Sequence, residues 1–398
     1  MSVAPLSEIG ELVEPVSSWA PECDDPDGLF SYIDLSAVDQ HDKIIASARE
    51  IVCVEAPSRA RQVVREGDIL VSTVRPNLNA VARVPSELDG ATASTGFCVL
   101  RPRAGQLDSH YLYQWVKSPR FVSDMVRKTT GASYPAVSDR TVRESLIPLP
   151  PLPEQRRIAE ILDKADELRT KRRAAVAKLD TLTQSIFLDM FGDPATNPKG
   201  WPETASLGEV ADIVSGITKG RQLNGKVARL VPYLAVINVQ DRALNLTTVK
   251  MIEATEEEIA RYRLQRGDLL LTEGGDPDKL GRGTLWGDEL PECIHQNHVF
   301  RVRLTSRVVE PLFLEWLIGS ARGKRYFLRS AKQTTGIATI NMTQLRGFPL
   351  LLPPVELQRE FARRLAAVES VEGTQLTSLA RLNGAFASLQ HRAFRGEL

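Results

Sequence analysis

The sequence has few cysteines and no long apolar run. Its four cysteines, Cys23, Cys53, Cys98 and Cys293, lie far apart and form no Cys-x-x-Cys pair, which excludes a disulfide framework and a zinc ribbon. No window approaches the ~18 uninterrupted apolar residues that a membrane span requires. Residues 1–12 lack the basic and apolar regions of a signal peptide. These absences predict a soluble, cytoplasmic protein with no membrane partner.

The sequence also lacks an excess of charge of either sign. Its 398 residues include 50 Lys and Arg, 50 Asp and Glu, and 42% hydrophobic residues. The balance excludes a polybasic protein that coats nucleic acid indiscriminately, but it is compatible with a local basic face. The hydrophobic content excludes a mainly disordered chain. The length predicts two or three domains.

Complete catalytic motifs are missing as well. The chain has no Gly-x-Gly-x-x-Gly after a strand, no nucleophile elbow, and no Asn-Pro-Pro-aromatic motif of an amino-methyltransferase. Residues 220–226 have Walker spacing, but Val227 replaces the hydroxyl residue that would hold magnesium. Cys293, His295 and His298 share one short segment, a poor geometry for tetrahedral ligation, so we expect a surface loop there. The sequence therefore predicts no catalytic residue and no bound metal.

What the sequence does contain is a duplication. Residues 6–13 return as residues 207–214, at an offset of 201 (207 − 6 = 201). The other repeated landmarks are Tyr32 and Tyr233, residues 65–70 and 265–270, Trp115 and Trp316, residues 129–131 and 334–336, and Gln155 and Gln358. A period this long excludes stacked solenoid repeats. The chain is therefore expected to be a tandem duplication of one whole module.

Each copy predicts a globular part, then a proline-rich hinge, then a long helix. Short β-rich runs entered through Gly-Asp turns, with helical patches between them, predict a mixed or antiparallel sheet. Heptad-like apolar spacing after the first hinge predicts a helix that ends near Phe191, before Gly192-Asp193-Pro194. Such a helix is about 55 Å long. A second helix is expected after Pro353-Pro354.

We expect the two long helices to pack as an antiparallel coiled coil, with part of their broad apolar stripes facing a partner protein. Arg172 and Gln375 interrupt the apolar rows at the same place, as polar residues do where they fix register. The alternative is that each helix belongs only to the core of its own domain. The predicted fold class is α+β, with two similar mixed α/β domains joined by the two helices and related by a pseudo-twofold axis.

The hinge Pro148-Leu149-Pro150-Pro151-Leu152-Pro153-Glu154-Gln155-Arg156 begins a set of motifs that carry a resemblance. The set continues with residues 190–194, residues 197–202 and the C-terminal residues 393–398. With the duplication, they make essentially the whole chain resemble a specificity subunit of a type I restriction-modification system. The second hinge departs from this pattern, since it lacks the Pro-Glu-Gln of the first.

The resemblance implies a non-catalytic subunit with two target-recognition domains. Residues 1–150 and 193–350 are then the recognition domains, each reading half of a split site on double-stranded DNA. Residues 151–192 and 351–398 are the spacer helices, which dock two modification (methyltransferase) subunits. Those partners bind S-adenosylmethionine and methylate adenine. Two restriction (motor-nuclease) subunits, which use ATP and magnesium, are further candidate partners, and this chain itself binds no cofactor.

Base readout needs donors and acceptors on loops, and we expect readout residues where the copies differ beside shared landmarks. Ser94-Thr95-Gly96, for example, stands opposite His295-Gln296-Asn297. The predicted DNA contacts are Arg75, Asn77, Asn79, Ser94, Thr95, Ser133 and Tyr134 in the first copy and Lys219, Arg221, Lys279, Arg282, Gln296, Asn297, Thr339 and Asn341 in the second. Arg120 and Arg127, with Arg325 and Lys332 as their apparent counterparts, are predicted phosphate contacts. Ordinary polar loops are the alternative for each residue.

Two other functions compete with DNA recognition. A coiled-coil scaffold whose modules bind protein predicts no salt-sensitive DNA binding, even when the methylation partners are present. An enzyme with a degenerate active site predicts methyl transfer by the isolated chain. The target sequence cannot be read from the chain, since loop geometry and DNA deformation both contribute to it.

Overall fold

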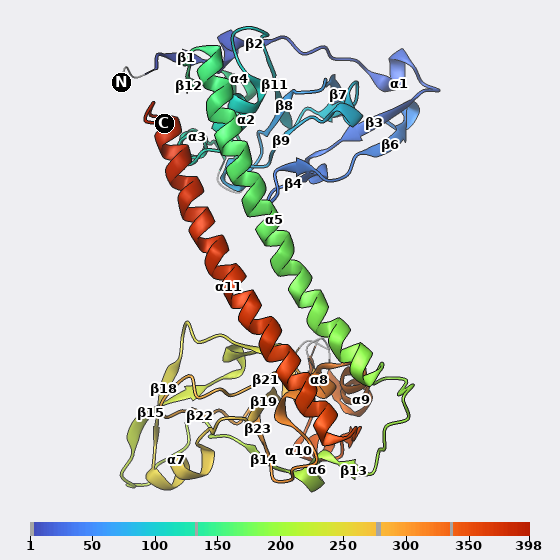
Figure 1. The fold of residues 1–398 in the computed structure, drawn as a ribbon, viewed down its shortest axis with the longest axis vertical. Coiled ribbons are helices and arrows are strands. Elements are labelled where there is room, and N and C mark those ends of the chain that lie inside the picture. The colour runs from blue at the N-terminus through green and yellow to red at the C-terminus, as the bar shows by residue number, and fades with distance from the viewer. Residues whose placement is uncertain (1–3, 132–133, 276–279, 335–336) are drawn as a thin grey trace. The chain divides into compact units, whose positions relative to one another are not determined.

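A computed structural model describes residues 4–131, 134–275, 280–334 and 337–398. The chain forms two compact units (Figure 1). Unit 1 consists of Met1–Val176 and Thr374–Leu398, and unit 2 of Ala177–Gly373. Two long helices, α5 (Leu152–Phe191) and α11 (Val355–Ala393), each begin in one unit and end in the other. Each unit is therefore a globular part with a segment of both helices.

Unit 1 is built on two four-stranded sheets. The main sheet has the order β2 (Val13–Glu14), β11 (Phe97–Pro102), β8 (Ile69–Ser72) and β9 (Val81–Arg83), and all its pairs are antiparallel. The second sheet has the order β6 (Arg49–Val52), β3 (Leu29–Ile33), β10 (Thr92–Ser94) and β7 (Ala60–Val63), with β3 and β10 parallel. The predicted sheet of mixed direction is therefore present.

Shorter elements complete unit 1. Strand β1 (Leu6–Glu8) pairs with β12 (Leu146–Pro148), and β4 (Val38–Asp39) pairs with β5 (Ile44–Ile45). The helices are α1 (Pro21–Asp24), α2 (Ser109–Val116), α3 (Pro119–Arg127) and α4 (Asp139–Arg143). Helix α2 packs against β8, β9 and β11.

Unit 2 repeats this plan. Its main sheet has the order β14 (Ala211–Ser215), β23 (Val299–Leu304), β19 (Leu269–Thr272) and β21 (Gly283–Leu285). Its second sheet has the order β18 (Lys250–Ala254), β15 (Arg229–Leu234) and β22 (Ile294–His295), again with one parallel pair, β15 with β22. The common connectivity confirms that the two globular parts are copies of one fold.

Unit 2 also contains shorter elements. The strand pairs are β13 (Ala205–Ser206) with β26 (Pro349–Leu350) and β16 (Val239–Gln240) with β17 (Ala243–Leu244). The helices are α6 (Leu207–Val210), α7 (Glu256–Tyr262), α8 (Pro311–Gly319), α9 (Ala321–Ser330) and α10 (Met342–Arg346). A further small sheet joins β20 (Gly274–Gly275), β25 (Ile337–Thr339) and β24 (Lys332–Thr334).

The Gly-Asp turns owe their recurrence to a buried ion pair. Gly67 and Gly267 adopt positive φ angles of 83° and 88°, which glycine tolerates at little cost. The aspartate that follows is buried and accepts a hydrogen bond from the backbone N–H three residues before it. Each aspartate also pairs with an arginine on the neighbouring strand: Asp68 with Arg101 at 2.7 Å, and Asp268 with Arg303 at 2.7 Å.

The hinges share a buried glutamine that ties each long helix to its globular part. Gln155 accepts a hydrogen bond from the Asp108 N–H and donates to the carbonyls of Gln106 and Pro150. Gln358 likewise accepts from Glu310 N–H and donates to two carbonyls. The glutamine thus satisfies buried backbone groups in both hinges, although the residues before it differ.

In unit 1 the start of α5 packs against the end of α11. Ile158 and Leu162 of α5 lie in one buried cluster with Phe386 of α11 and Phe394 beyond it. The Arg169 guanidinium donates to Asn383 and, one turn later in α5, Arg172 donates to Gln375. As the residue number rises along α5, the number of the contacting residue on α11 falls, which shows that the two helices pack antiparallel in this unit. Arg172 and Gln375, the polar residues that interrupt the apolar rows, contact each other.

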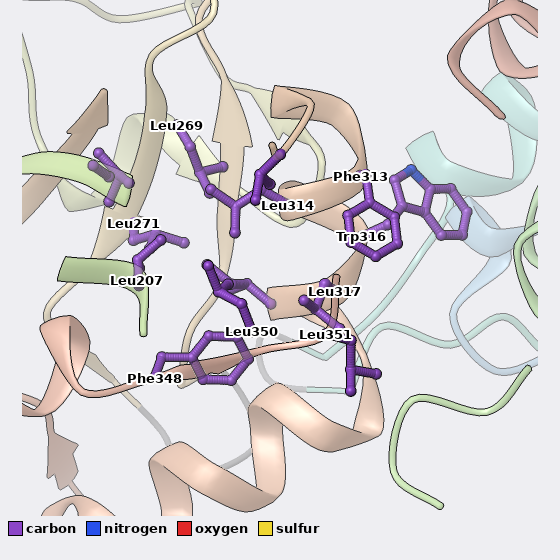
Figure 2. Close-up of a cluster of buried hydrophobic side chains, with 14 of the residues drawn as sticks. Leu207, Leu269, Leu271, Phe313, Leu314, Trp316, Leu317, Phe348, Leu350 and Leu351 are labelled. Carbon is purple, nitrogen blue, oxygen red and sulfur yellow. The ribbon is translucent and has the colours of Figure 1, made fainter. Parts of the chain in front are cut away.

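In unit 2 the aromatic end of α5 meets the start of α11. The Phe187 ring lies 5.4 Å from the Phe361 ring and 5.4 Å from that of Trp316, between ring centroids. Figure 2 shows the adjoining core, where Leu269 and Leu271 of β19 face side chains of α8 such as Leu314, with Phe348 and Leu350 nearby. Among the residues that the structure describes, no helix is apolar over enough of its length to cross a bilayer.

Candidate DNA interface

Three loops of unit 1 meet at one end of its main sheet. Strands β8 and β11 are antiparallel, so the end of β8 and the start of β11 lie side by side, with Ser72 opposite Phe97. The Thr73 N–H donates to the Gly96 carbonyl at 3.0 Å, and the Val137 N–H donates to the Thr73 carbonyl at 2.9 Å. The structure thereby brings together residues 73–79, 94–96 and 134–137, which carry most of the DNA contacts predicted for the first copy.

The predicted residues in these loops differ in exposure. The side chains of Arg75, Asn77, Thr95 and Tyr134 are exposed, and Asn79 is half-buried. Ser94 is only 2% exposed, and its hydroxyl accepts a hydrogen bond from the Gly96 N–H. Ser94 therefore shapes the loop rather than presenting a group to solvent. Ser133 lies outside the described residues.

Sequence analysis missed one residue that holds this site, Lys43. The Lys43 ammonium donates to the carbonyls of Leu78 at 3.3 Å and Asn79 at 2.5 Å. Burial lowers the pKa of Lys43, and the positive charge of Lys117 lowers it further. Lys43 comes from the β4–β5 turn, far away in sequence, and no motif marks it.

The corresponding loops of unit 2 meet in the same way. The Glu273 N–H donates to the His298 carbonyl, and the Ile340 N–H donates to the Glu273 carbonyl. Gln296, Asn297 and Thr339 are half-buried at this edge. Lys279 lies outside the described residues. Arg282 is half-buried, and its Nε is a buried atom without a hydrogen-bond partner among the residues that the structure describes.

An exposed contact between a histidine and a glutamate at this edge was also missed. The His298 Nδ1 lies 2.5 Å from a Glu273 carboxylate oxygen, where unit 1 has Thr73 and Gly96. Two polar side chains thus take the place of a threonine and a glycine, and this is the kind of difference between the copies that base readout requires.

The strand register corrects the alignment of the two copies. Thr92 lies opposite Tyr32 in the parallel pair of unit 1, and Ile294 lies opposite Tyr233 in that of unit 2. Ser94 therefore corresponds to Gln296 and not to His295. Cys293 and His295 are buried, not on a surface loop. Burial also lowers the pKa of His295 to about 4, and its Nδ1 bonds to the Val299 carbonyl.

Two predicted residues of unit 2 have structural roles instead. The Arg221 guanidinium makes two 2.6 Å hydrogen bonds with the Glu258 carboxylate, so its donors are largely used within the unit. Asn341 caps α10, because its Oδ1 accepts from the Gln344 N–H at 2.9 Å. Lys219, on an exposed turn, has no such partner among the contacts of the described residues.

The predicted phosphate contacts lie mainly on the helices after α2 and α8. Arg120 and Arg127 are exposed on α3, where Arg127 pairs with Asp124 at 2.6 Å. Arg325 is exposed on α9, and Lys332 lies in β24. Ser118 and Ser320 occupy the N-cap positions of α3 and α9, so the structural counterpart of Arg120 is Arg322, and its pairing with Arg325 was wrong. Contact of all these residues with DNA stays a prediction.

Known proteins share this sequence and fold. Residues 58–178 match the family model of the type I restriction modification DNA specificity domain. The StySPI specificity subunit of Salmonella potsdam is 26% identical over 322 residues, which cover 76% of this chain and 68% of that protein. The EcoKI specificity subunit of Escherichia coli K12 is also 26% identical, with the same coverage.

Solved structures show a similarity to the same kind of protein. A chain from a study of complex assembly and conformational transition of the type I R-M system superposes with a TM-score of 0.66 at 27% identity, covering 100% of this chain and 99% of its own. The S subunit of M. genitalium, at 14% identity and a TM-score of 0.54, shares the fold. The duplicated domains, the hinge motif and these likenesses agree: the chain is similar to the DNA-specificity subunits of type I restriction-modification systems.

Proposed function

We propose that each unit reads one half of a bipartite site on double-stranded DNA, with the loops at the end of its main sheet as the reading surface. The observation that supports this is the contrast within the duplication. The sheets share strand order and register, whereas the side chains at that one edge differ, as Glu273 and His298 differ from Thr73 and Gly96. A common scaffold with different exposed donors and acceptors suits the reading of two different half-sites.

We further propose that α5 and α11 dock two modification subunits. Both helices carry large apolar side chains that stay exposed, namely Leu168, Leu182 and Leu188 on α5 and Val371 and Leu376 on α11. Burial of such side chains against a partner protein would remove apolar surface from water, which favours association. In this proposal the partners bind S-adenosylmethionine and methylate adenine, two restriction subunits supply ATP- and magnesium-dependent cleavage, and the complex works in the cytoplasm.

The test is to reconstitute the chain with its modification subunit and to map methylated adenines across a genome. A bipartite motif, two short specified sequences separated by unspecified bases, is expected. A contiguous motif, or no motif, would count against the proposal. DNA binding by the complex should weaken steeply with salt, because phosphate contacts release counterions, whereas a protein-binding scaffold would show no such binding.

A second experiment addresses the division of labour between units. Residues 1–150 are exchanged for those of a relative with a known bipartite motif, and methylation is mapped again. Only one half of the motif should change. A change in both halves would contradict the assignment of one unit to one half-site.

A further inference from the structure

Strained backbone is concentrated at one place in unit 1. Three of its described non-glycine residues have positive φ angles: Lys43 at 59°, Arg75 at 50° and Asn79 at 48°. All three meet at the loop of residues 75–79, because the Lys43 ammonium donates to the Asn79 carbonyl. Such conformations are costly for residues with a side chain and persist where the surrounding structure over-determines them, typically at functional sites.

The loop is held from both sides. The Arg75 N–H donates to the Pro135 carbonyl at 2.8 Å, and the Leu78 N–H donates back to the Arg75 carbonyl at 2.9 Å. Lys43 is itself fixed, since its carbonyl accepts a 2.7 Å hydrogen bond from the Tyr113 hydroxyl. The direction in which the Arg75 side chain leaves the backbone is therefore set before any ligand arrives, which reduces the entropy lost on binding.

The Arg75 side chain keeps its hydrogen-bonding capacity. Its guanidinium carbon lies 5.7 Å from the centroid of the Tyr134 ring, and Tyr134 is 72% exposed. Among the described residues no carboxylate pairs with Arg75, in contrast to Arg221, whose guanidinium is engaged by Glu258. The two side chains border a recess of about 320 Å³ that is also lined by Ser36 and Gln40.

This arrangement suits one kind of ligand. A guanidinium carries parallel N–H donors that match O6 and N7 of guanine in the major groove, the commonest specific protein–DNA contact. An aromatic ring stacked on the guanidinium fixes its plane without using its donors. In unit 2, Gly274 pairs with Thr339 as Val74 pairs with Ala136, so Gly275 stands where Arg75 does and offers no side chain.

We propose that Arg75 reads a guanine in the half-site of unit 1 and that Tyr134 is its positioning residue. The inference rests on the proposed function and adds the base and the residue that recognises it. Because the unit 2 counterpart is glycine, the contact belongs to one half-site alone.

The experiment is adenine-methylation mapping with the complete complex of this chain and its modification subunit, carrying Arg75→Ala or Arg75→Lys. One guanine in one half of the motif is expected to become unspecified in both variants, with discrimination at that position reduced roughly 5- to 150-fold, while the other half is unchanged. Arg65→Ala is the control, since Arg65 is exposed at the opposite end of β8 and should leave the motif intact.

The lysine variant separates base readout from phosphate contact. A phosphate contact would survive Arg75→Lys, and in Arg75→Ala it would weaken methylation of all sites equally and lower the salt slope by about 1. That result would overturn the proposal.

Tyr134→Phe keeps the ring and should keep the motif, whereas Tyr134→Ala should partly reproduce Arg75→Ala.

Two outcomes separate this proposal from the function on which it rests. A wild-type complex without a bipartite motif would refute the function itself, whereas a bipartite motif that Arg75→Ala leaves unchanged would refute only the role of Arg75. Arg75→Gly guards against misfolding, because glycine adopts positive φ freely. Its melting temperature should equal or exceed that of the wild type while the guanine is lost from the motif.

Discussion

A buried carboxyl group in unit 2 should make its stability depend on pH. Glu315 of α8 is 7% exposed, and one carboxylate oxygen accepts a 2.9 Å hydrogen bond from the Leu285 N–H. Burial raises the pKa of Glu315 to about 7 from 4.5, although Arg242 nearby favours the charged form. Unit 1 has Gln114 at this position, directly before Trp115 as Glu315 is before Trp316. A neutral amide is therefore compatible with the fold, and Glu315→Gln is the appropriate change.

The sign and size of the effect follow from the two pKa values. The native state holds the proton up to about pH 7 and the unfolded chain releases it near 4.5, so the free energy of unfolding falls as pH rises between these values and levels off above them. A shift of 2.5 units (7 − 4.5) corresponds to about 3 kcal/mol. The Glu315→Gln variant does not lose this free energy, because its amide does not titrate. Its advantage should be about 1 kcal/mol at pH 5 and about 3 kcal/mol at pH 8.

Thermal and urea unfolding of the wild-type protein and of Glu315→Gln at pH 5, 6 and 8 measure this difference in stability directly. At pH 8 the melting temperature of unit 2 should rise by roughly 5–10 °C in the variant. Glu257→Gln, which removes an exposed carboxylate of the same unit, should show a difference that does not change with pH. An advantage of Glu315→Gln that is equal at pH 5 and pH 8, or a variant less stable at pH 8, would refute the reasoning.

Four further substitutions test the packing. Gln155→Ala and Gln358→Ala each leave buried backbone groups unpaired and should cost about 2–4 kcal/mol of unfolding free energy. Limited proteolysis should then cleave the unit that holds the changed hinge. Cleavage confined to the other unit would be inconsistent with these hydrogen bonds. Asp68→Asn leaves the buried guanidinium of Arg101 without a countercharge and should cost about 3–5 kcal/mol in urea unfolding, and a cost below 1 kcal/mol would argue against the pair. Phe187→Ala removes the centre of an aromatic cluster and should cost about 3–5 kcal/mol, measured by calorimetry; an unchanged melting temperature would contradict that packing.

The sequence predicted the elements whose signal is local. The duplication, the Gly-Asp turns and the long helices were all visible, and the helix expected to end near Phe191 ends there. The polar pair Arg172 and Gln375 was also predicted and is in contact. These features depend on the period of apolar residues or on a turn conformation that only a few residues adopt, so neighbours in the chain reveal them.

The loops that we propose as the DNA-reading surface were predicted as a group, but the contacts of their individual side chains were not. The structure brings residues 73–79 and 94–96 together, as their place after and before neighbouring strands suggested. Whether a given side chain is free depends on partners far away in sequence, which no local pattern records. Glu258 engages Arg221, and Lys43 supports the loop of Arg75. The role of Asn341 as a helix cap was not predicted either, although the capping residue and Gln344 three residues later are a local signal.

By itself the sequence determined that one module occurs twice, which helices follow it and which family it resembles, because repeats and periodicities can be detected from the order of the residues alone. Tertiary structure alone decided the strand register, which pairs Ser94 with Gln296, and the strained setting of Arg75. Both depend on hydrogen bonds between segments many residues apart, and the offset between the copies shifts by a residue or two wherever a loop differs in length.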